Sequence, residues 1–560
     1  MRLTFALAAV FFLAVANAQD TQHEKPAAPA EPAKPETRPS IPEAPPESKA
    51  FTDASRIMDP VKKIEAIEKW KKDYPNASNL SSADELILST LVQRLPQQRD
   101  RIRKLAKSIY ESAKPEQKST TAGNVALTLV EDNAFLKDAE HYAKTAVGSL
   151  TQAKYLEQQH KRYTERKQKA PSDDELIKRF RETHADLVGI LGRVYYKMGR
   201  PDRARPLLEE SYGVVREQTV VAAALGDMAF KSGDTAKATE YLIPALLSGR
   251  PAATSIAKPD VEAIYKKTHA GSLEGFDSML DAEYRKRFPS PVQLEPYKPS
   301  DKRSQRLVLA EVFTGAGCPP CVGADLAFDA ALERYSRKDV AVVMYHVHVP
   351  QPDPMTTAET PDLSKTYGVR GVPTYFIDGK ETSMGGGGRD YAKNIYNKFN
   401  PTIEKDLETP ADAKIAATAA LEGNSVRVSA TASDVKSESN DLKLVALLLE
   451  KQIRYTGENG IRFHPMVVRA IATAPISSGN FEHKFDLDAV SASLKSSLDD
   501  YEAKGHRGKV FKFSEKKYQI DRADLAVVVF VQDPKDRHVL QSAYIDLSPA
   551  PAGHRTTETK

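Results

Sequence analysis

The two cysteines of this 560-residue chain, Cys318 and Cys321, lie three positions apart. They occur in the stretch FTGAGCPPCVGAD, where Pro319 and Pro320 stand between them. Two thiols at this spacing can form a redox-active dithiol, half of a metal site, or a small structural disulfide. A Cys318–Cys321 disulfide closes a very short loop and adds little chain-entropy stabilisation, so a purely structural bond is a poor explanation.

The cysteines stand between an expected strand and an expected helix. The apolar run RLVLAEVF (306–313) predicts a buried strand, and the apolar residues from Leu326 to Tyr335 predict a helix. At such a turn Cys318 would cap the helix N-terminus, where the helix dipole favours a thiolate. Cys321 would lie one turn inside the helix. We therefore expect Cys318 to attack a substrate disulfide and Cys321 to resolve the mixed disulfide.

The two prolines bear on the direction of the redox reaction. Neither Pro319 nor Pro320 has an N–H group that could stabilise a Cys318 thiolate, and the turn contains no histidine. We expect the pKa of Cys318 to be lowered only moderately, to around 7 rather than around 4. A dithiol of this kind favours reduction of its substrates.

The segment after the cysteines continues as an α/β pattern. A second strand is expected at DVAVVMYHVHV (339–349), a third after the loop in YGVRGVPTYFIDG (367–379), and a closing helix at GRDYAKNIYNKF (388–399). With its CPPC and GVPT motifs, the segment 300–406 resembles the thioredoxin-fold family. The resemblance implies a cis peptide bond between Val372 and Pro373, with Pro373 facing the dithiol. It also implies that the backbone of Val372 pairs with a bound peptide.

The chain departs from thioredoxins at two positions. Gly317 stands where thioredoxins have a tryptophan, which leaves a smaller surface beside Cys318. Glu311 is the best match to the acidic residue beneath the thioredoxin dithiol, although its spacing differs by one. A buried carboxyl there would have a raised pKa and could shuttle a proton for Cys321. An exposed glutamate on the strand surface is the alternative.

A metal site is a competing interpretation of the cysteines. His346 and His348 alternate near the end of the second strand and could complete a Cys2His2 site, although no second C-x-x-C pair exists. Ordinary strand histidines explain them better. The GGGG at 385–388 lacks the Lys-Ser/Thr of a P-loop and predicts a flexible turn, so we expect no cofactor. His464 and Arg469 lie in a β pattern and are expected to be sheet-edge residues.

The N-terminus predicts export. Segment 1–18 has the features of a secretory signal, with Arg2, a short apolar core and small residues before Gln19. The Pro/Ala/Glu-rich segment 19–50 predicts a disordered tether, and 550–560 predicts a disordered tail. We expect an exported protein, periplasmic or else extracellular, without a membrane span after cleavage; an uncleaved anchor is the alternative. The net charge of +4 gives no indication of nucleic-acid binding.

Helical periodicity runs through 51–295. Segments that begin at Leu191 and Leu225 align at an offset of 34 residues, and this period resembles the tetratricopeptide repeat. The clearest repeats are 185–218 and 219–252. A scaffold and a peptide-binding groove are equally good explanations of such repeats.

The C-terminal part of the chain shows a β pattern. From 411 to 549, short apolar or alternating runs bounded by turns resemble an antiparallel β-sandwich of immunoglobulin or fibronectin type, with a helical insertion near 488–503. The expected fold is therefore multidomain: α-helical repeats, then an α/β thioredoxin-like domain, then an all-β sandwich.

These features together predict an exported thiol–disulfide oxidoreductase that acts on protein disulfides. Its partners would be a disulfide-containing client, an upstream thiol that donates electrons, and a peptide bound by the helical repeats. One alternative is a cell-envelope scaffold whose thioredoxin-like domain is catalytically silent. Another is a copper- or zinc-handling domain that uses Cys318, Cys321 and a histidine.

Overall fold

The computed structural model describes residues 45–478 and 480–547. The expected signal segment (1–18) and tail (550–560) lie outside these residues, as does most of the expected tether (19–50). The chain divides into two compact units, Met1–Val221 and Ala222–Lys560. No helix in the described ranges combines the length and the apolar character that a membrane crossing requires.

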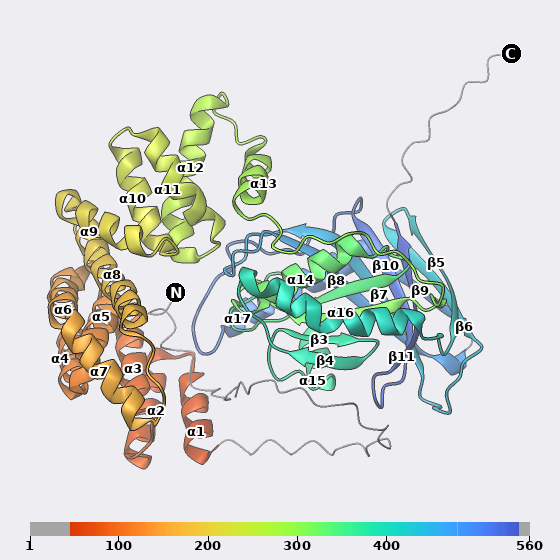
Figure 1. The fold of residues 1–560 in the computed structure, drawn as a ribbon, viewed down its shortest axis with the longest axis horizontal. Coiled ribbons are helices and arrows are strands. Elements are labelled where there is room, and N and C mark those ends of the chain that lie inside the picture. Colours follow the sequence, from red (N-terminus) through yellow and green to blue (C-terminus); the bar gives the residue numbers. More distant parts are fainter. Residues whose placement is uncertain (1–44, 479, 548–560) are drawn as a thin grey trace. The chain divides into compact units, whose positions relative to one another are not determined.

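Helices follow one another without a strand up to α13, as the sequence predicted for 51–295 (Figure 1). The first unit contains α1 (Pro46–Ser55), α2 (Pro60–Asp73), α3 (Leu80–Arg94), α4 (Arg99–Ser112), α5 (Lys118–Leu129), α6 (Leu136–Ser149), α7 (Gln152–Glu165), α8 (Asp173–Lys197) and α9 (Pro201–Val214). Helix α10 (Thr219–Lys231) spans the boundary, and α11 (Thr235–Leu247), α12 (Pro251–Thr268) and α13 (Phe276–Arg287) belong to the second unit. The expected tether ends earlier than predicted, because α1 starts at Pro46 and proline fits the first turn of a helix.

The two aligned segments form helix pairs with equivalent contacts. A Cβ atom on Gly192 of α8 would lie 2.8 Å from Leu208 Cγ of α9. One on Gly226 of α10 would lie 2.5 Å from Leu242 Cγ of α11. Glycine at the same position of each pair therefore lets the two helices approach closely.

The second unit continues with two β-sheets and four α-helices. The strands are β1 (Val308–Thr314), β2 (Val340–His346), β3 (Thr374–Ile377), β4 (Lys380–Met384), β5 (Lys414–Glu422), β6 (Ser425–Ser433), β7 (Lys443–Arg454), β8 (Phe463–Pro475), β9 (Phe481–Asp486), β10 (Leu525–Gln532) and β11 (Val539–Asp546). The helices are α14 (Cys321–Arg334), α15 (Thr360–Thr366), α16 (Ala392–Glu408) and α17 (Leu487–Lys504). One sheet has the order β11-β10-β7-β8-β2-β1-β3-β4, and the other has the order β5-β6-β9.

Strand β1 lies at the centre of the α/β part, parallel to β2 and antiparallel to β3. Its side chains alternate between two buried faces. Ala310 and Val312 pack under α14 and α16, whereas Leu309 and Phe313 pack with side chains of β7 and β10. Both faces of β1 are therefore covered, which explains why the predicted strand is apolar throughout.

The large sheet runs through both predicted domains. Strand β2 pairs with β8 through Met344 and Val467, and the two halves of the sheet then pack face to face. Ser542 Oγ of β11 donates to the Leu307 carbonyl just before β1, at 2.7 Å. The other face of β7 and β10 packs on the β5-β6-β9 sheet. A helical region followed by sheets is confirmed, and the segments 300–406 and 411–549 both contribute strands to the eight-stranded sheet.

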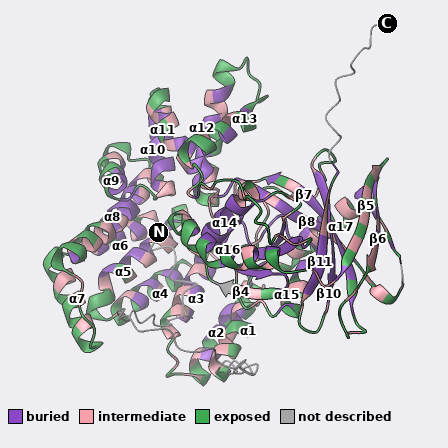
Figure 2. Ribbon diagram, turned by 45° about the vertical axis from the view of Figure 1, so that its right-hand side comes forward, coloured by how far each residue is buried: buried purple, intermediate pink, exposed green. Residues whose placement is uncertain are grey.

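Burial differs sharply from one element to another (Figure 2). Strands β7 and β10 and helix α14 consist largely of buried residues, whereas α7 has none. Helix α7 and the start of α8, separated at Pro171, cover a stretch that is rich in Lys, Arg, Asp and Glu. The helix that begins at Cys321 is therefore among the buried elements.

Replacing Gly226 tests the close approach of the helix pair. Gly226→Val should lower the free energy of unfolding by about 2 kcal/mol, because the new side chain overlaps Leu242. Gly148→Ala is the control, since nothing lies within 4 Å of that position in α6, and alanine should be neutral or slightly stabilising. Thermal unfolding followed by circular dichroism measures both. Equal melting temperatures for the two variants would contradict the packing.

Candidate redox site

Cys318 and Cys321 form a disulfide at the turn between β1 and α14. The Sγ atoms are 2.05 Å apart and the Cα atoms 5.3 Å apart, as the sequence spacing allowed. The residues are almost completely enclosed, with exposed fractions of 1% for Cys318 and 0% for Cys321. A thiol from solvent can reach this bond only if part of the surrounding chain moves.

Helix α14 begins later than the sequence suggested. Its N-cap is Pro320, so the expectation that Cys318 caps the helix is wrong. The first amides of the helix are already engaged: Cys321 N–H donates to the Cys318 carbonyl at 3.2 Å, and Gly323 N–H donates to the Gly387 carbonyl at 2.8 Å. The two prolines shift the helix start because they supply no N–H donors of their own. Few amides remain to stabilise a Cys318 thiolate.

The expected peptide-binding residues lie directly beside the disulfide. The Val372–Pro373 peptide bond is cis, as the family resemblance implied. The Val372 carbonyl oxygen is 3.7 Å from Cys318 Sγ, and Pro373 is buried just before β3. The Val349–Pro350 bond is also cis, and nothing in the sequence had indicated it.

The four glycines at 385–388, termed the glycine segment, cover one side of the turn. Gly387 N–H donates to the Pro320 carbonyl at 2.8 Å. A Cβ atom on Gly386 would lie 1.9 Å from that carbonyl oxygen and 2.8 Å from Pro373 Cγ. The sequence predicted a flexible turn, but the glycines allow backbone to pack against the backbone of the CPPC turn.

A second segment covers the residues before Cys318. It joins β7 to β8, spans 455–462, and is termed the hairpin segment. Asn459 N–H donates to the Ala316 carbonyl at 3.0 Å, and a Cβ atom on Gly457 would lie 2.3 Å from the same oxygen. Gln351 fills the space beside Gly317, 2.7 Å from where a Cβ would stand. The smaller surface expected at Gly317 is therefore occupied by another part of the chain.

Glu311 is buried, as expected, but it lies on the wrong face of β1 for the proposed role. Its Oε1 accepts hydrogen bonds from the hydroxyls of Tyr345 at 3.2 Å and Tyr367 at 2.8 Å. Burial raises its pKa to about 7, although these hydroxyls act to lower it. Because strand side chains alternate, Glu311 points towards β7 and β10, away from α14 and Cys321. Proton transfer between Glu311 and Cys321 is therefore not supported by the geometry.

A second buried carboxyl, Asp325, lies on the helix that begins at Cys321. It lies one helical turn after Cys321 on α14, is 5% exposed, and accepts a hydrogen bond from Thr314 Oγ1 at 2.7 Å. Burial raises its pKa to about 7, against the lowering effects of Thr314 and His346. A carboxyl with this pKa can take or return a proton near neutral pH. The sequence signal was available: one acid at i+4 from Cys321 within the otherwise apolar start of a helix.

His346, at the end of β2, and His348, just after it, are engaged in hydrogen bonds and ring contacts. His346 Nδ1 is 2.8 Å from Asp353 Oδ2, which also accepts from Ala316 N–H at 2.6 Å. Burial acts to raise the pKa of Asp353, but His346 and the hydrogen bonds hold it at about 2. Burial lowers the pKa of His348, which stacks on Tyr501, to about 4. No group of three or more Cys, His, Asp or Glu side chains within 45–478 and 480–547 could hold a metal ion.

Two polar residues of β8 lie at a different place in the sheet from the one predicted. His464 and Arg469 were expected at a sheet edge, but β8 lies between β7 and β2, and both residues are buried. His464 Nε2 is 2.9 Å from the Tyr455 carbonyl, and burial lowers its pKa to about 3. Arg469 forms an ion pair with Glu450 at 2.9 Å.

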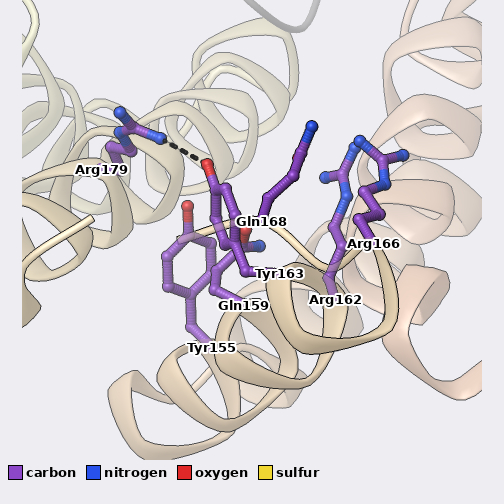
Figure 3. A pocket seen from close by; sticks show the side chains of 7 residues that line it. All are labelled: Tyr155, Gln159, Arg162, Tyr163, Arg166, Gln168 and Arg179. Carbon is purple, nitrogen blue, oxygen red and sulfur yellow. Dashed lines mark hydrogen bonds between the residues drawn. The ribbon is translucent and has the colours of Figure 1, made fainter. Parts of the chain in front are cut away.

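A polar cavity of about 230 Å³ lies far from the cysteines in sequence, between α7 and α8. It is lined by Tyr155, Gln159, Arg162, Tyr163, Arg166, Gln168 and Arg179. Figure 3 shows Arg179 pointing to the hydroxyl of Tyr163, at 3.4 Å, while Arg162 and Arg166 lie side by side away from the tyrosines. Its lining contains no cysteine, histidine or carboxylate, so it offers no group for thiol exchange.

No family model matches the chain, and no curated protein matches it. Among solved structures, HBP35 of Porphyromonas gingivalis is similar to 47% of this chain and 82% of that chain, with 16% identity and a TM-score of 0.29. A similarity at this level does not establish a shared fold.

Replacing Asp325 tests its raised pKa. The pKa of Asp325 is about 7 in the folded protein and about 4 in the unfolded chain. Between these values the unfolded chain loses the proton more readily, so the free energy of unfolding of the parent falls as the pH rises. The free energy of unfolding of Asp325→Asn should equal that of the parent at pH 4. It should exceed the parent's value increasingly up to pH 7, by on the order of 3 kcal/mol, and remain higher by that amount above pH 7. Urea unfolding across this pH range measures the difference.

The control for this measurement is Asp362→Asn, at an exposed carboxyl on α15 that pairs with Lys365. It should follow the parent at every pH. A constant difference between Asp325→Asn and the parent from pH 4 to 8 would show that Asp325 is charged throughout.

Proposed function

We propose that this protein is an exported thiol–disulfide oxidoreductase, periplasmic by first choice, that reduces disulfides of client proteins. The observation that carries the proposal is the arrangement at the β1–α14 turn. A Cys318–Cys321 disulfide faces the carbonyl of Val372 before a cis Pro373, with Asp325 one helical turn below. In the proposal, the α/β part is a thioredoxin-like domain joined to an immunoglobulin-like sandwich.

The reaction begins with the reduced dithiol. The Cys318 thiolate attacks one sulfur of the client disulfide, so that a mixed disulfide forms and a client thiolate leaves. Asp325 takes the proton of the Cys321 thiol, and the resulting thiolate attacks Cys318 Sγ. The second client thiolate leaves, and two electrons have passed from the protein to the client. An upstream dithiol then reduces the Cys318–Cys321 disulfide, and Asp325 returns the proton to Cys321.

The reducing direction is supported by the start of α14. A strongly oxidising dithiol needs a very stable Cys318 thiolate, which backbone N–H groups normally provide. At this turn Pro319 and Pro320 have no such group, and the next amides donate to carbonyls of Cys318, Pro319 and Gly387. In this proposal the helix pairs, as tetratricopeptide-like repeats, recruit a client or donor peptide.

The second candidate function, a scaffold with a silent redox domain, is favoured by one observation. Neither cysteine has appreciable exposure, whereas a reactive thiol is normally accessible. In that case the disulfide would stabilise the turn and would not exchange with partners.

Insulin reduction distinguishes the two functions. With a dithiol donor in excess, the full-length chain should accelerate the reduction of insulin, because Cys318 starts each exchange. Cys318→Ser should lower the rate to the background without protein. Equal rates for the parent and Cys318→Ser would support the scaffold and contradict the oxidoreductase.

The reduction potential of the pair tests the direction of exchange. Equilibration with thiol buffers, followed by alkylation and mass spectrometry, should give a value nearer to that of thioredoxin, about −270 mV, than to that of strong oxidases, about −120 mV. A value close to the oxidase potential would mean that the Cys318 thiolate is strongly stabilised despite the two prolines.

A further inference from the structure

The disulfide is buried, so other parts of the chain must shield it from solvent. Two segments contact the backbone of the turn directly: the hairpin segment at Ala316 and the glycine segment at Pro320. The contacts at Ala316 and Pro320 are made by main-chain groups, and the Asn459 side chain adds a hydrogen bond to the Gly315 carbonyl at 3.4 Å. The contacts on the other side of each segment therefore control how readily a thiol from solvent reaches the cysteines.

The hairpin segment is anchored to α13 by buried charges. Arg462 Nε is 2.6 Å from Asp281 Oδ1, and the two side chains are only 5% and 6% exposed. Arg462 Nη2 also pairs with Asp277 at 3.1 Å, and Arg454 pairs with Asp281 Oδ2 at 2.8 Å. Removing Asp281 would leave the buried Arg462 with Asp277 as its remaining carboxylate partner, so this anchor is costly to break.

The glycine segment is anchored to the same helix. It continues directly into Arg389, whose Nη2 donates to the Tyr284 hydroxyl at 3.0 Å. The Arg389 guanidinium also lies 5.3 Å from the ring centre of Phe288, just after α13. Asp281 and Tyr284 are three residues apart, so both anchors lie on one face of α13.

We infer that α13 is a clamp: it holds the hairpin segment and the glycine segment over the disulfide and so shields the bond from solvent. Asp281 and Tyr284 are its positioning residues. Asp281 fixes the hairpin segment over Ala316, and Tyr284 fixes the glycine segment over Pro320. Loss of either contact frees one side of the turn and exposes Cys318 to an attacking thiol more often. The inference concerns the regulation of the same site and rests on the proposed exchange chemistry.

The test measures how fast a small dithiol reduces the disulfide of the full-length oxidised protein. Dithiothreitol is converted to its cyclic disulfide while Cys318 and Cys321 become thiols, and alkylation followed by mass spectrometry counts the thiols at each time. Asp281→Asn should increase the rate constant about tenfold and Tyr284→Phe about threefold, because the bond is attacked only after local opening. The reduction potential should stay unchanged, since the attacked bond and its turn are the same.

Glu283→Gln is the matched control. Glu283 lies on the same helix and forms an ion pair within it, with Arg287 at 3.0 Å. Its rate constant should equal that of the parent, and Asp281→Glu should restore much of the parent's slow rate. Circular dichroism checks that each variant is folded. If Asp281→Asn does not fold, the rate constant of Tyr284→Phe alone tests the clamp.

Parent-like rate constants for folded Asp281→Asn and Tyr284→Phe would overturn the clamp. An acceleration of reduction by Glu283→Gln as large as that by Asp281→Asn and Tyr284→Phe would also overturn it. These outcomes are separate from a failure of the proposed function, which appears as absent insulin turnover by the parent. The dithiothreitol measurement follows the protein's own disulfide and needs no client.

Discussion

The surroundings of the cysteines depend on main-chain atoms packing against main-chain atoms. Gly386 lies against Pro320 and Gly457 lies against Ala316 at distances that no Cβ atom would permit, and Gly387 N–H donates to the Pro320 carbonyl. Together with side chains such as Gln351, these contacts enclose the disulfide, and Gly387 engages the Gly323 amide at the start of α14. They account for the burial of the disulfide, and in the proposed function they leave few amides to stabilise a Cys318 thiolate.

The local features of the site could be predicted from the sequence because they depend on neighbouring residues. The order of strand, CPPC turn and helix follows from apolar patterning, and the Val372–Pro373 loop follows from a short motif. The choice of Glu311 as the proton shuttle failed for an equally local reason. A shift of one residue in a strand moves a side chain to the opposite face. Asp325 could have been found from helical spacing, since i and i+4 share a face.

The merging of the two sheets could not be predicted in this way. The pairing of β2 with β8 joins Met344 to Val467, and an apolar run does not specify which distant strand lies beside it. This pairing makes the C-terminal strands part of the surroundings of the candidate site. It buries His464 and Arg469, which the sequence placed at an edge, and it brings the hairpin segment over Ala316. The C-terminal region thus covers the dithiol as well as extending the sheet.

The most direct test of the account is to capture the mixed disulfide in cells that produce the protein. Cys321→Ser leaves Cys318 without a resolving thiol, so a client should remain bound to it through a bond that a reductant releases. We expect mass spectrometry to identify a client peptide linked to Cys318, and no such adduct in a variant in which both cysteines are serine. The absence of any covalent adduct on Cys321→Ser would contradict a function in disulfide exchange.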